Sequence, residues 1–296
     1  MALLWAAATV AASAFQVGRN ALQRSMMSRT GPWGATLVRF LFGLPFSIVF
    51  TLVALAMSHD LHPQFGWPFW WPALAGALAQ VLATAALLTA MHQAGFAVGT
   101  ALQQSSVPLA AIVGLAVFGD NLSWIGWSGV ALTTLGLAIL VWPRKAADAK
   151  HPALGVALGI ISGLCFGFAL NAFRHAGLRL EPDHPFFAAT ASVTIVQAMQ
   201  AGVLTLFLLL RDRPALVAVL RGWRESLGAG LCGACASAGW FLALNLAPAA
   251  AVRALGVIEM PMAAAAGHRL FREGLTLRQL LGVAIVTIGV AMTAGL

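Results

Sequence analysis

Charged residues are scarce in this sequence of 296 residues. They make up 9% of the chain, whereas about a quarter of the residues are charged in an ordinary soluble domain. Hydrophobic residues make up 60%, and the mean hydropathy is +0.87. A chain of this composition cannot cover itself with polar side chains in water, so a soluble globular protein is excluded.

The sequence also has no loop long enough to fold as a soluble domain and no strand-like alternation of polar and apolar residues. Instead, apolar segments of about 20 residues, the length that crosses a bilayer, follow one another along the chain. Backbone groups have no water to bond inside lipid, so such segments must be helical. We therefore predict an all-α membrane protein with ten transmembrane helices, at residues 2–22, 33–57, 69–91, 95–118, 124–142, 153–173, 186–210, 227–246, 249–270 and 276–295.

Cysteine is rare, and sequence motifs of enzymes are absent. Cys165, Cys232 and Cys235 all fall inside predicted helices, so we expect no disulfides. Cys232 and Cys235 form a CxxC pair without a nearby histidine or acid, and we interpret them as small packing residues. His59 and His62, in the sequence HDLH, give only weak support for a metal site. Because HExxH, GxSxG, GxGD and Walker motifs are missing, we predict no enzyme activity, no cofactor and no metal site.

The net charge of +8 does not indicate nucleic-acid binding, because the basic residues are spread over short loops instead of forming one face. The loops after even-numbered predicted helices hold only Arg174 and Arg179. Most basic residues follow odd-numbered helices, at Arg24, Arg29, Arg144, Lys145, Lys150, Arg211, Arg213, Arg221, Arg224, Arg269, Arg272 and Arg278. Cytoplasmic loops carry the excess of lysine and arginine in membrane proteins. This distribution predicts that both termini lie outside, in the periplasm of a Gram-negative host.

The chain contains one pattern twice. Adding 153 to a position in the fourth and fifth predicted helices leads to its counterpart in the ninth and tenth, without a gap. An offset of 151 aligns FQVGRNALQ (15–23) with FGFALNAFR (166–174). Each copy therefore holds five helices, the first at residues 1–143 and the second at residues 152–296. The pairs related by the offset of 153 include Pro108 and Pro261, Phe118 and Phe271, Asp120 and Glu273, Gly129 and Gly282, and Gly136 and Gly289.

Because five is an odd number, the second copy must enter the membrane from the side opposite to the first. Inverted repeats of this kind are typical of secondary transporters, in which rocking of one half against the other exposes a midplane site to each side in turn. The repeat therefore favours a transporter that works by alternating access.

The repeated segments resemble those of a known family. SSVPLAAIVGLAVFGDNLS (105–123), IEMPMAAAAGHRLFREGLT (258–276) and ATLVRFLFG (35–43) are similar to the paired EamA-type repeats of the drug/metabolite transporter (DMT) superfamily. The resemblance implies ten helices around a central substrate cavity and export of small metabolites, and bacterial amino-acid exporters of the YddG type are the group it resembles most. Two positions depart from the family pattern, because Asp120 replaces a glutamate and Arg39 maps to Ser192 in the second copy.

One of the nine acidic residues, Glu259, lies deep within a predicted helix, and the others fall in loops or at helix ends. A carboxylate in that position is unfavourable unless it is paired or lines a wet cavity. Glu259 is therefore a candidate ligand for a substrate amino group or a candidate proton-coupling site, and the alternative is a structural ion pair with Arg253 or Arg39. Six positions separate Glu259 from Arg253, about 600 degrees of helical rotation, so the two should not share a helix face. For each arginine we favour snorkelling to the headgroups over a fork for a substrate carboxylate.

Neutral polar residues within the predicted helices complete the candidate site. Any one of them can instead form a hydrogen bond between helices, but together they indicate a cavity for neutral or zwitterionic solutes. Gln16 lies where small four-helix relatives that expel lipophilic cations have an acid, so a dedicated cation pump is less favoured. The predicted substrate-binding residues are Gln16, Asn20, Arg39, Gln80, Thr84, Gln103, Ser106, Asn171, Trp240, Asn245, Arg253 and Glu259.

Glycine, proline and tryptophan positions predict how the helices pack. Four glycines of the sixth helix recur every four residues and should let a neighbouring backbone approach, with a surface that slides during rocking as the alternative. Three prolines should kink their helices, and tryptophans near helix ends should anchor them at the membrane interfaces. These residues are Gly155, Gly159, Gly163 and Gly167; Pro45, Pro108 and Pro261; and Trp67, Trp70, Trp71, Trp124, Trp127, Trp142 and Trp223.

We therefore expect a secondary or facilitative exporter of small metabolites, above all amino acids, in the bacterial inner membrane. One alternative is a proton-coupled exporter of drugs or cationic compounds that uses Glu259, and another is a membrane scaffold or lipid-binding protein that transports nothing. The expected partners are a polar or zwitterionic substrate and membrane lipid, without nucleic acid. We expect a monomer or a homodimer.

Overall fold

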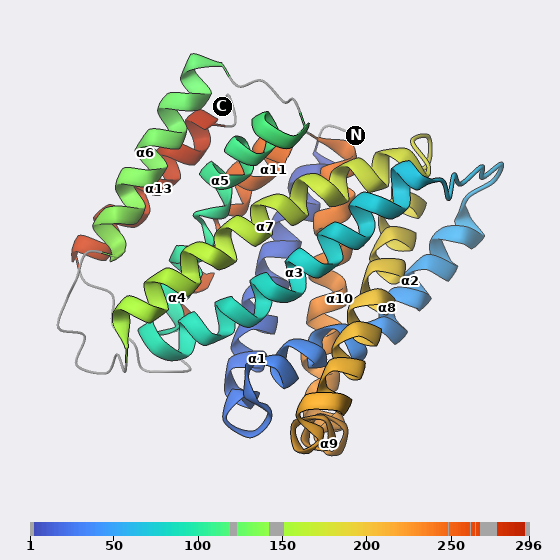
Figure 1. The fold of residues 1–296 in the computed structure, drawn as a ribbon. Helices are drawn as coiled ribbons and strands as arrows, with labels where there is room; N and C mark the ends of the chain where they lie inside the picture. Colours follow the sequence, from blue (N-terminus) through green and yellow to red (C-terminus); the bar gives the residue numbers. More distant parts are fainter. Residues whose placement is uncertain are drawn as a thin grey trace. The chain divides into compact units, whose positions relative to one another are not determined.

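The structure is a computed structural model that describes residues 3–118, 123–141, 151–247, 249–260, 262–263, 265–266 and 277–293 (Figure 1). These residues form helices and connecting segments without strands. The helices are α1 (Leu4–Leu41), α2 (Leu44–Met57), α3 (Trp67–Ala94), α4 (Phe96–Gln103), α5 (Ser106–Val113), the π-helical η1 (Gly114–Phe118), α6 (Trp124–Val141), α7 (Pro152–Leu180), α8 (Pro185–Arg211), α9 (Arg213–Arg221), α10 (Trp223–Leu246), α11 (Ala249–Gly256) and α13 (Leu277–Thr293). Helical residues therefore occur in every segment that the sequence predicts as a membrane helix.

Several helices of the described chain have the length and composition of membrane spans. Five stretches are long and apolar enough to cross a bilayer, and two shorter apolar helices accompany them at Ser106–Val117 and Leu280–Gly289. The long stretches are Leu4–Met57, Trp67–Ala94, Ala153–Leu180, Pro185–Arg211 and Trp223–Leu246. This pattern indicates a multi-pass membrane protein, and the number of ten crossings stays a prediction.

The first predicted span and the beginning of the second lie in one helical element, α1, which has a sharp break. Gly31 has φ 64° and ψ 177°, a backbone conformation that residues other than glycine rarely adopt. The chain then breaks again at Phe42 and Gly43, and α2 begins with Pro45 in its first turn. Proline is tolerated there because the first helical N–H groups have no partner within the helix. The kink predicted at Pro45 is thus a short interruption just before it.

The chain divides into two compact units, each of which combines parts of both sequence repeats. Unit 1 comprises residues 1–81 and 172–248, and unit 2 comprises residues 82–171 and 249–296. Helices α3 and α7 supply residues to both units. The repeat boundaries predicted at residues 143 and 152 therefore do not separate the compact units, and they stay predictions.

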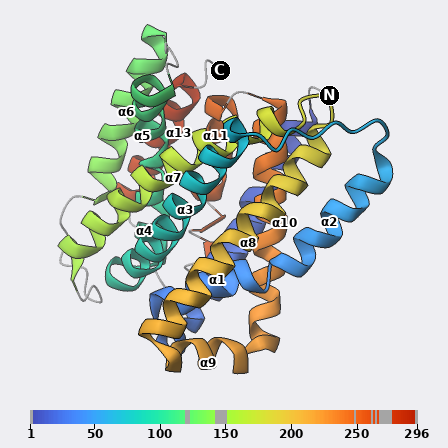
Figure 2. The same cartoon turned by 45° about the vertical axis from the view of Figure 1, so that its right-hand side comes forward.

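In unit 1, α1 packs antiparallel against α10 (Figures 1 and 2). A Cβ at Gly239 would lie 2.9 Å from that of Ala12, and a Cβ at Gly228 would lie 3.7 Å from Leu22. The small residues of α10 let the two backbones approach closely. Because lipid provides no hydrophobic drive between helices, such close packing is what holds them together.

A short amphipathic helix, α9, lies in a segment that the sequence analysis treats as a loop. The Asp212 side chain caps it by accepting a hydrogen bond of 3.1 Å from Ala215 N. Leu216 and Val219 pack into a core cluster of unit 1 that also contains Phe40. With nine residues, α9 is too short to appear in a search for membrane-length apolar segments.

In unit 2, the glycine face predicted for the sixth membrane helix is a packing surface of α7. A Cβ at Gly159 would lie 2.6 Å from the Cβ of Leu102, and a Cβ at Gly167 would lie 2.8 Å from Ala110 N. The other two glycines of the face are packed in the same way. A Cβ at Gly155 would lie 2.7 Å from that of Ala94, and a Cβ at Gly163 would meet the side chain of Ser105. Close packing is therefore confirmed, and a sliding role for the same face stays a prediction.

Helices α6 and α13 of unit 2 pack antiparallel through two equivalent contacts. A Cβ at Gly136 would lie 2.7 Å from Val286 N, and a Cβ at Gly289 would lie 2.5 Å from Thr133 N. The offset of 153 converts Gly136 into Gly289 and Thr133 into Val286, so each contact is the counterpart of the other. A local two-fold axis perpendicular to both helices relates contacts of this kind.

Candidate functional site

Two helices of unit 2 are interrupted at positions that correspond in the repeat. Helix α4 ends at Gln103 and α5 begins at Ser106, whereas α11 ends at Gly256 and helical structure resumes at Glu259. The two turns, at 104–105 and 257–258, are related by the offset of 153. The same offset relates Ser106 to Glu259, the first residue after each turn.

The backbone hydrogen bonds of the two turns also correspond. Val107 N donates to Gln104 O at 2.9 Å, and Met260 N donates to Val257 O at 2.8 Å. A proline stands four positions after Gln104, and another stands four positions after Val257. Proline lacks an N–H for the carbonyl four residues earlier and its ring clashes with that carbonyl, which accounts for the break at 104–105. Pro108 thus interrupts its helix as predicted, whereas the second proline, Pro261, lies outside the described residues.

A buried charged cluster surrounds these turns. Arg253 Nη2 donates to Gln104 Oε1 at 3.2 Å and to Ser106 Oγ at 3.0 Å. Gln104 Nε2 in turn donates to Glu259 Oε2 at 3.4 Å. Arg253 is 5% exposed and Glu259 is fully buried. A guanidinium and a carboxylate therefore lie on either side of one amide, away from water.

Arg253 and Glu259 do not lie on one continuous helix, as the prediction of separate helix faces assumed, because residues 257–258 form a turn. Both side chains consequently reach Gln104. The roles predicted for Glu259, as a ligand for a substrate amino group, a proton-coupling site or a partner in an ion pair, stay predictions.

The favoured prediction that Arg39 and Arg253 snorkel to the headgroups is wrong. Arg39 is 3% exposed, and its Nη2 donates to Ser237 Oγ at 3.4 Å. Arg253 is 5% exposed and donates to Gln104 and Ser106. The guanidinium groups therefore lie among polar side chains inside the protein.

Other predicted site residues of unit 1 form pairs instead of one cluster. Trp240 is buried, and its Nε1 donates to Gln16 Oε1 at 2.9 Å. Gln200 Nε2 donates to Gln80 Oε1 at 2.9 Å. Asn245 Nδ2 donates to a backbone carbonyl, that of Pro185, at 3.4 Å. These bonds are of the interhelical kind that the sequence analysis allowed for each residue.

Three of the predicted residues of unit 2 take no part in the described hydrogen bonds of the charged cluster. Asn171 Nδ2 donates to Ala110 O and to Gly167 O, both at 3.1 Å. Thr84 and Gln103 are buried. Among the predicted residues of unit 2, only Ser106, Arg253 and Glu259 thus meet around Gln104 in the described hydrogen bonds.

Residues 1–142 and 153–295 match the EamA-like transporter family. The chain belongs to this family. Membership implies a membrane transporter of small molecules, in agreement with the resemblance found in the sequence. A solved structure described as "Crystal structure of protein" is similar to the chain with a TM-score of 0.61 and 15% sequence identity. The similarity covers 97% of this chain and 95% of the other, and at this identity it shows the fold alone. No curated protein matches the chain.

For an EamA-like transporter, the residue that the sequence analysis missed most clearly is Arg19. It lies inside the first predicted span and is 1% exposed. Its Nε and Nη2 donate to Asn20 Oδ1 at 3.2 and 2.7 Å. The rule that singled out Glu259, an ionisable side chain within a membrane helix, would have found Arg19 as well. Gln104 and Ser237 also belong to the neutral polar residues of the predicted helices, but nothing in the sequence distinguishes them from neighbours such as Gln103 that were placed in the predicted site.

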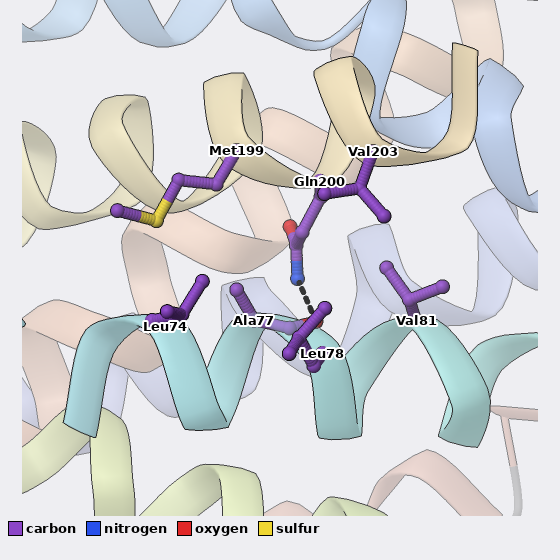
Figure 3. Close-up of a pocket in the computed structure, with 7 residues that line it drawn as sticks. All are labelled: Leu74, Ala77, Leu78, Val81, Met199, Gln200 and Val203. Carbon is purple, nitrogen blue, oxygen red and sulfur yellow. Dashed lines mark hydrogen bonds between the residues drawn. The ribbon is translucent and has the colours of Figure 1, made fainter. Parts of the chain in front are cut away.

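An apolar recess between α3 and α8 of the transporter is a poor substrate site. Figure 3 shows its lining, across which Gln200 Nε2 donates to Ala77 O at 3.1 Å. Leu74, Leu78 and Val203 line it and are between 43% and 47% exposed. Exposed aliphatic side chains on membrane helices suit lipid better than a polar solute.

Proposed function

We propose that this EamA-like transporter exports small polar metabolites, with amino acids as the substrate class, by alternating access between two inverted halves. The proposal includes both termini on the outer side of a bacterial inner membrane and a monomer or homodimer as the working form. Membership of the family provides the general activity, and features of the chain itself support the finer statements.

Alternating access by inverted halves is supported by the contacts between α6 and α13. These helices are counterparts in the repeat, they are antiparallel, and their contacts are related by the same offset. If both cross the bilayer, the axis that relates them lies in the membrane plane, as inverted repeats require.

The observation that carries the proposal is the buried cluster of Arg253, Gln104 and Glu259 at two corresponding helix breaks. In secondary transporters, substrate and coupling-ion sites form where membrane helices are discontinuous. A cluster of this kind is a charged and polar site inside an apolar protein, which suits a polar metabolite such as a zwitterion. Amino acids are the most common small zwitterionic metabolites, so they are the class we expect.

The test is counterflow in liposomes. Purified protein is reconstituted into vesicles that contain an unlabelled amino acid, and uptake of the same labelled amino acid is followed across a panel of neutral, acidic and basic examples. Alternating access predicts a transient accumulation of label above equilibrium, because each outward turnover is coupled to an inward one. Vesicles with Gln104→Leu should show much less accumulation, and vesicles with Gln64→Leu, a change at an exposed position, should match the wild type. Absence of label accumulation for every compound would support the scaffold or lipid-binding alternative instead.

A second candidate function is proton-coupled export of cationic compounds, favoured by the full burial of the Glu259 carboxylate. A buried acid that exchanges its proton for a cation is a common basis of such coupling. Arg253 beside the same amide opposes this reading, because its charge repels a cation. In proteoliposomes with an imposed pH gradient, Glu259→Gln should abolish gradient-driven transport of a cationic dye if the second function is correct. Unchanged dye transport by Glu259→Gln would contradict it.

A further inference from the structure

Two buried arginines of unit 1 pack over the same glycine. Arg19 is 1% exposed and Arg39 is 3% exposed, and both lie in α1, on either side of the break at Gly31. A Cβ at Gly233 of α10 would lie 3.1 Å from Arg39 Cγ and 3.5 Å from Arg19 Cδ. The absence of a side chain at Gly233 thus gives room to both arginine stems and brings them together inside unit 1.

We propose that Arg19 and Arg39 together bind the carboxylate of the transported substrate. This inference rests on the proposed transport function and narrows its substrate class. It assigns a binding role to Arg19, and it gives Arg39 a partner in that role.

The two guanidinium groups and the neighbouring amide of Asn20 bring several hydrogen-bond donors together. Arg19 occupies Asn20 Oδ1 with two N–H groups, and Arg39 donates to the hydroxyl of Ser237. Asn20 Nδ2 is buried and has no hydrogen-bond partner among the described residues of the protein. A ligand that accepts hydrogen bonds would therefore satisfy a donor that is otherwise costly to bury.

A second buried amide, that of Gln197 in α8, lies close to the turn that follows α1. Gln197 is 2% exposed, and neither atom of its amide has a partner in the part of the chain that the structure describes. A Cβ at Gly43, four residues after Arg39, would lie 3.3 Å from Gln197 Nε2. Buried amides of proteins are almost always hydrogen-bonded, so this one is a second group in unit 1 that can bond to a ligand.

Charge selects the chemical group of that ligand. Two guanidinium groups in a low-dielectric interior repel each other and any cation, and they attract an anion. The planar fork of a guanidinium matches the two oxygens of a carboxylate, and both oxygens can accept several hydrogen bonds at once. A substrate carboxylate is therefore the group that fits the arginine pair.

The test compares ligands that differ only at the carboxylate. Alanine, leucine, phenylalanine and glutamate are each paired with the α-carboxamide and with the amine that lacks the carboxyl group. Two readouts are used, inhibition of amino-acid counterflow in proteoliposomes and the thermal unfolding midpoint of the purified full-length protein in detergent. For at least one amino acid we expect the carboxamide and the amine to need at least about tenfold higher concentrations, because charge-assisted hydrogen bonds are lost.

Variants assign the effect to the arginine pair. Arg19→Gln and Arg39→Gln should remove the preference for the carboxylate, whereas the corresponding lysine variants should keep part of it, since they retain charge but lose the fork. Arg29→Gln is the matched control, because Arg29 is exposed and its Nη1 lies 3.2 Å from a Glu225 carboxylate oxygen. That variant should bind as the wild type does.

A glycine pair tests the geometry without a change of charge. Gly233→Ala places a methyl group against both arginine stems and should raise the KM for the carboxylate substrate several-fold. Gly202→Ala is its control, because nothing lies within 4 Å of a Cβ at that position. The Gly233 result keeps the inference testable even if an arginine variant fails to fold.

The outcomes separate this inference from the proposed function. Transport without preference for the carboxylate over the carboxamide and amine would overturn the inference and leave the transport proposal standing. Thermal stabilisation by carboxylate ligands that disappears in the arginine variants, in the absence of counterflow, would support the inference and overturn the transport mechanism. Neither counterflow nor stabilisation by any amino acid would overturn both.

Discussion

Arg253 and Glu259 lie six positions apart in the sequence, yet both of their side chains bond to the amide of Gln104. The turn at residues 257–258 makes this possible, because it ends the helical rotation that would otherwise point the two side chains in different directions. Gln104 itself lies in the corresponding turn of the first repeat. Two breaks and three side chains thus form one polar unit inside an apolar protein.

Removal of the bridging amide should therefore disturb both stability and transport. Gln104→Leu leaves Arg253 and Glu259 without this partner, and the loss of a hydrogen bond to a charged group costs about 1.5–3 kcal/mol. We expect a lower unfolding midpoint in detergent and at least a tenfold lower rate of counterflow. Gln64→Leu, at an exposed position, is the matched control and should leave both quantities unchanged. An unaltered transport rate in Gln104→Leu would show that the cluster plays no part in turnover.

Restoration of a continuous helix should impair transport without loss of stability. Pro108→Ala supplies an N–H for the carbonyl of Gln104 and removes a ring clash, effects that favour a helix by about 3 kcal/mol in a helix interior. We expect an equal or higher unfolding midpoint and slower counterflow. Pro214→Ala is the control, because Pro214 lies in the first turn of α9, where proline is tolerated. Faster or equal transport by Pro108→Ala would contradict a role for the break.

The two-fold contact between α6 and α13 predicts matched effects at its two glycines. Gly136→Ala and Gly289→Ala each place a methyl group within about 3 Å of the facing backbone, and overpacking of this kind typically costs about 1–3 kcal/mol. The two variants should lower the unfolding midpoint by similar amounts. Gly202→Ala should not lower it, because its Cβ would meet open space. A large effect at one glycine and none at the other would contradict the symmetric contact.

The distribution of basic loops predicts the sidedness of the chain. In a variant without Cys165, Cys232 and Cys235, a single cysteine at exposed position 221 should resist a membrane-impermeant thiol reagent in intact cells. A single cysteine at exposed position 64 should react with the same reagent. Permeabilised cells should label both, which controls for reactivity. The reverse pattern in intact cells would place both termini inside.

Predictability from sequence differed between the helices and the site. Apolar runs located helical segments because burial in lipid requires whole stretches of one composition, and Pro108 located a break because its chemistry acts on its own helix. The short helix α9 was missed because its amphipathic pattern is brief. Arg19 escaped notice although its position inside the first span was visible. The snorkelling predicted for Arg39 and Arg253 failed because each guanidinium is buried against a polar side chain of another segment, Ser237 and Gln104, respectively, which the sequence does not reveal.

The sequence by itself determined the class of protein and its duplicated plan. Composition decides whether a chain can cover itself with polar side chains in water. A constant offset between matching residues can be recognised without any knowledge of contacts. Only the tertiary structure decided which polar side chains meet, that Gln104 joins Arg253 to Glu259 and that Gly233 makes room for Arg19 and Arg39. Those contacts depend on where the helices break and on how closely they pack. Both depend on contacts between residues that are far apart in the sequence.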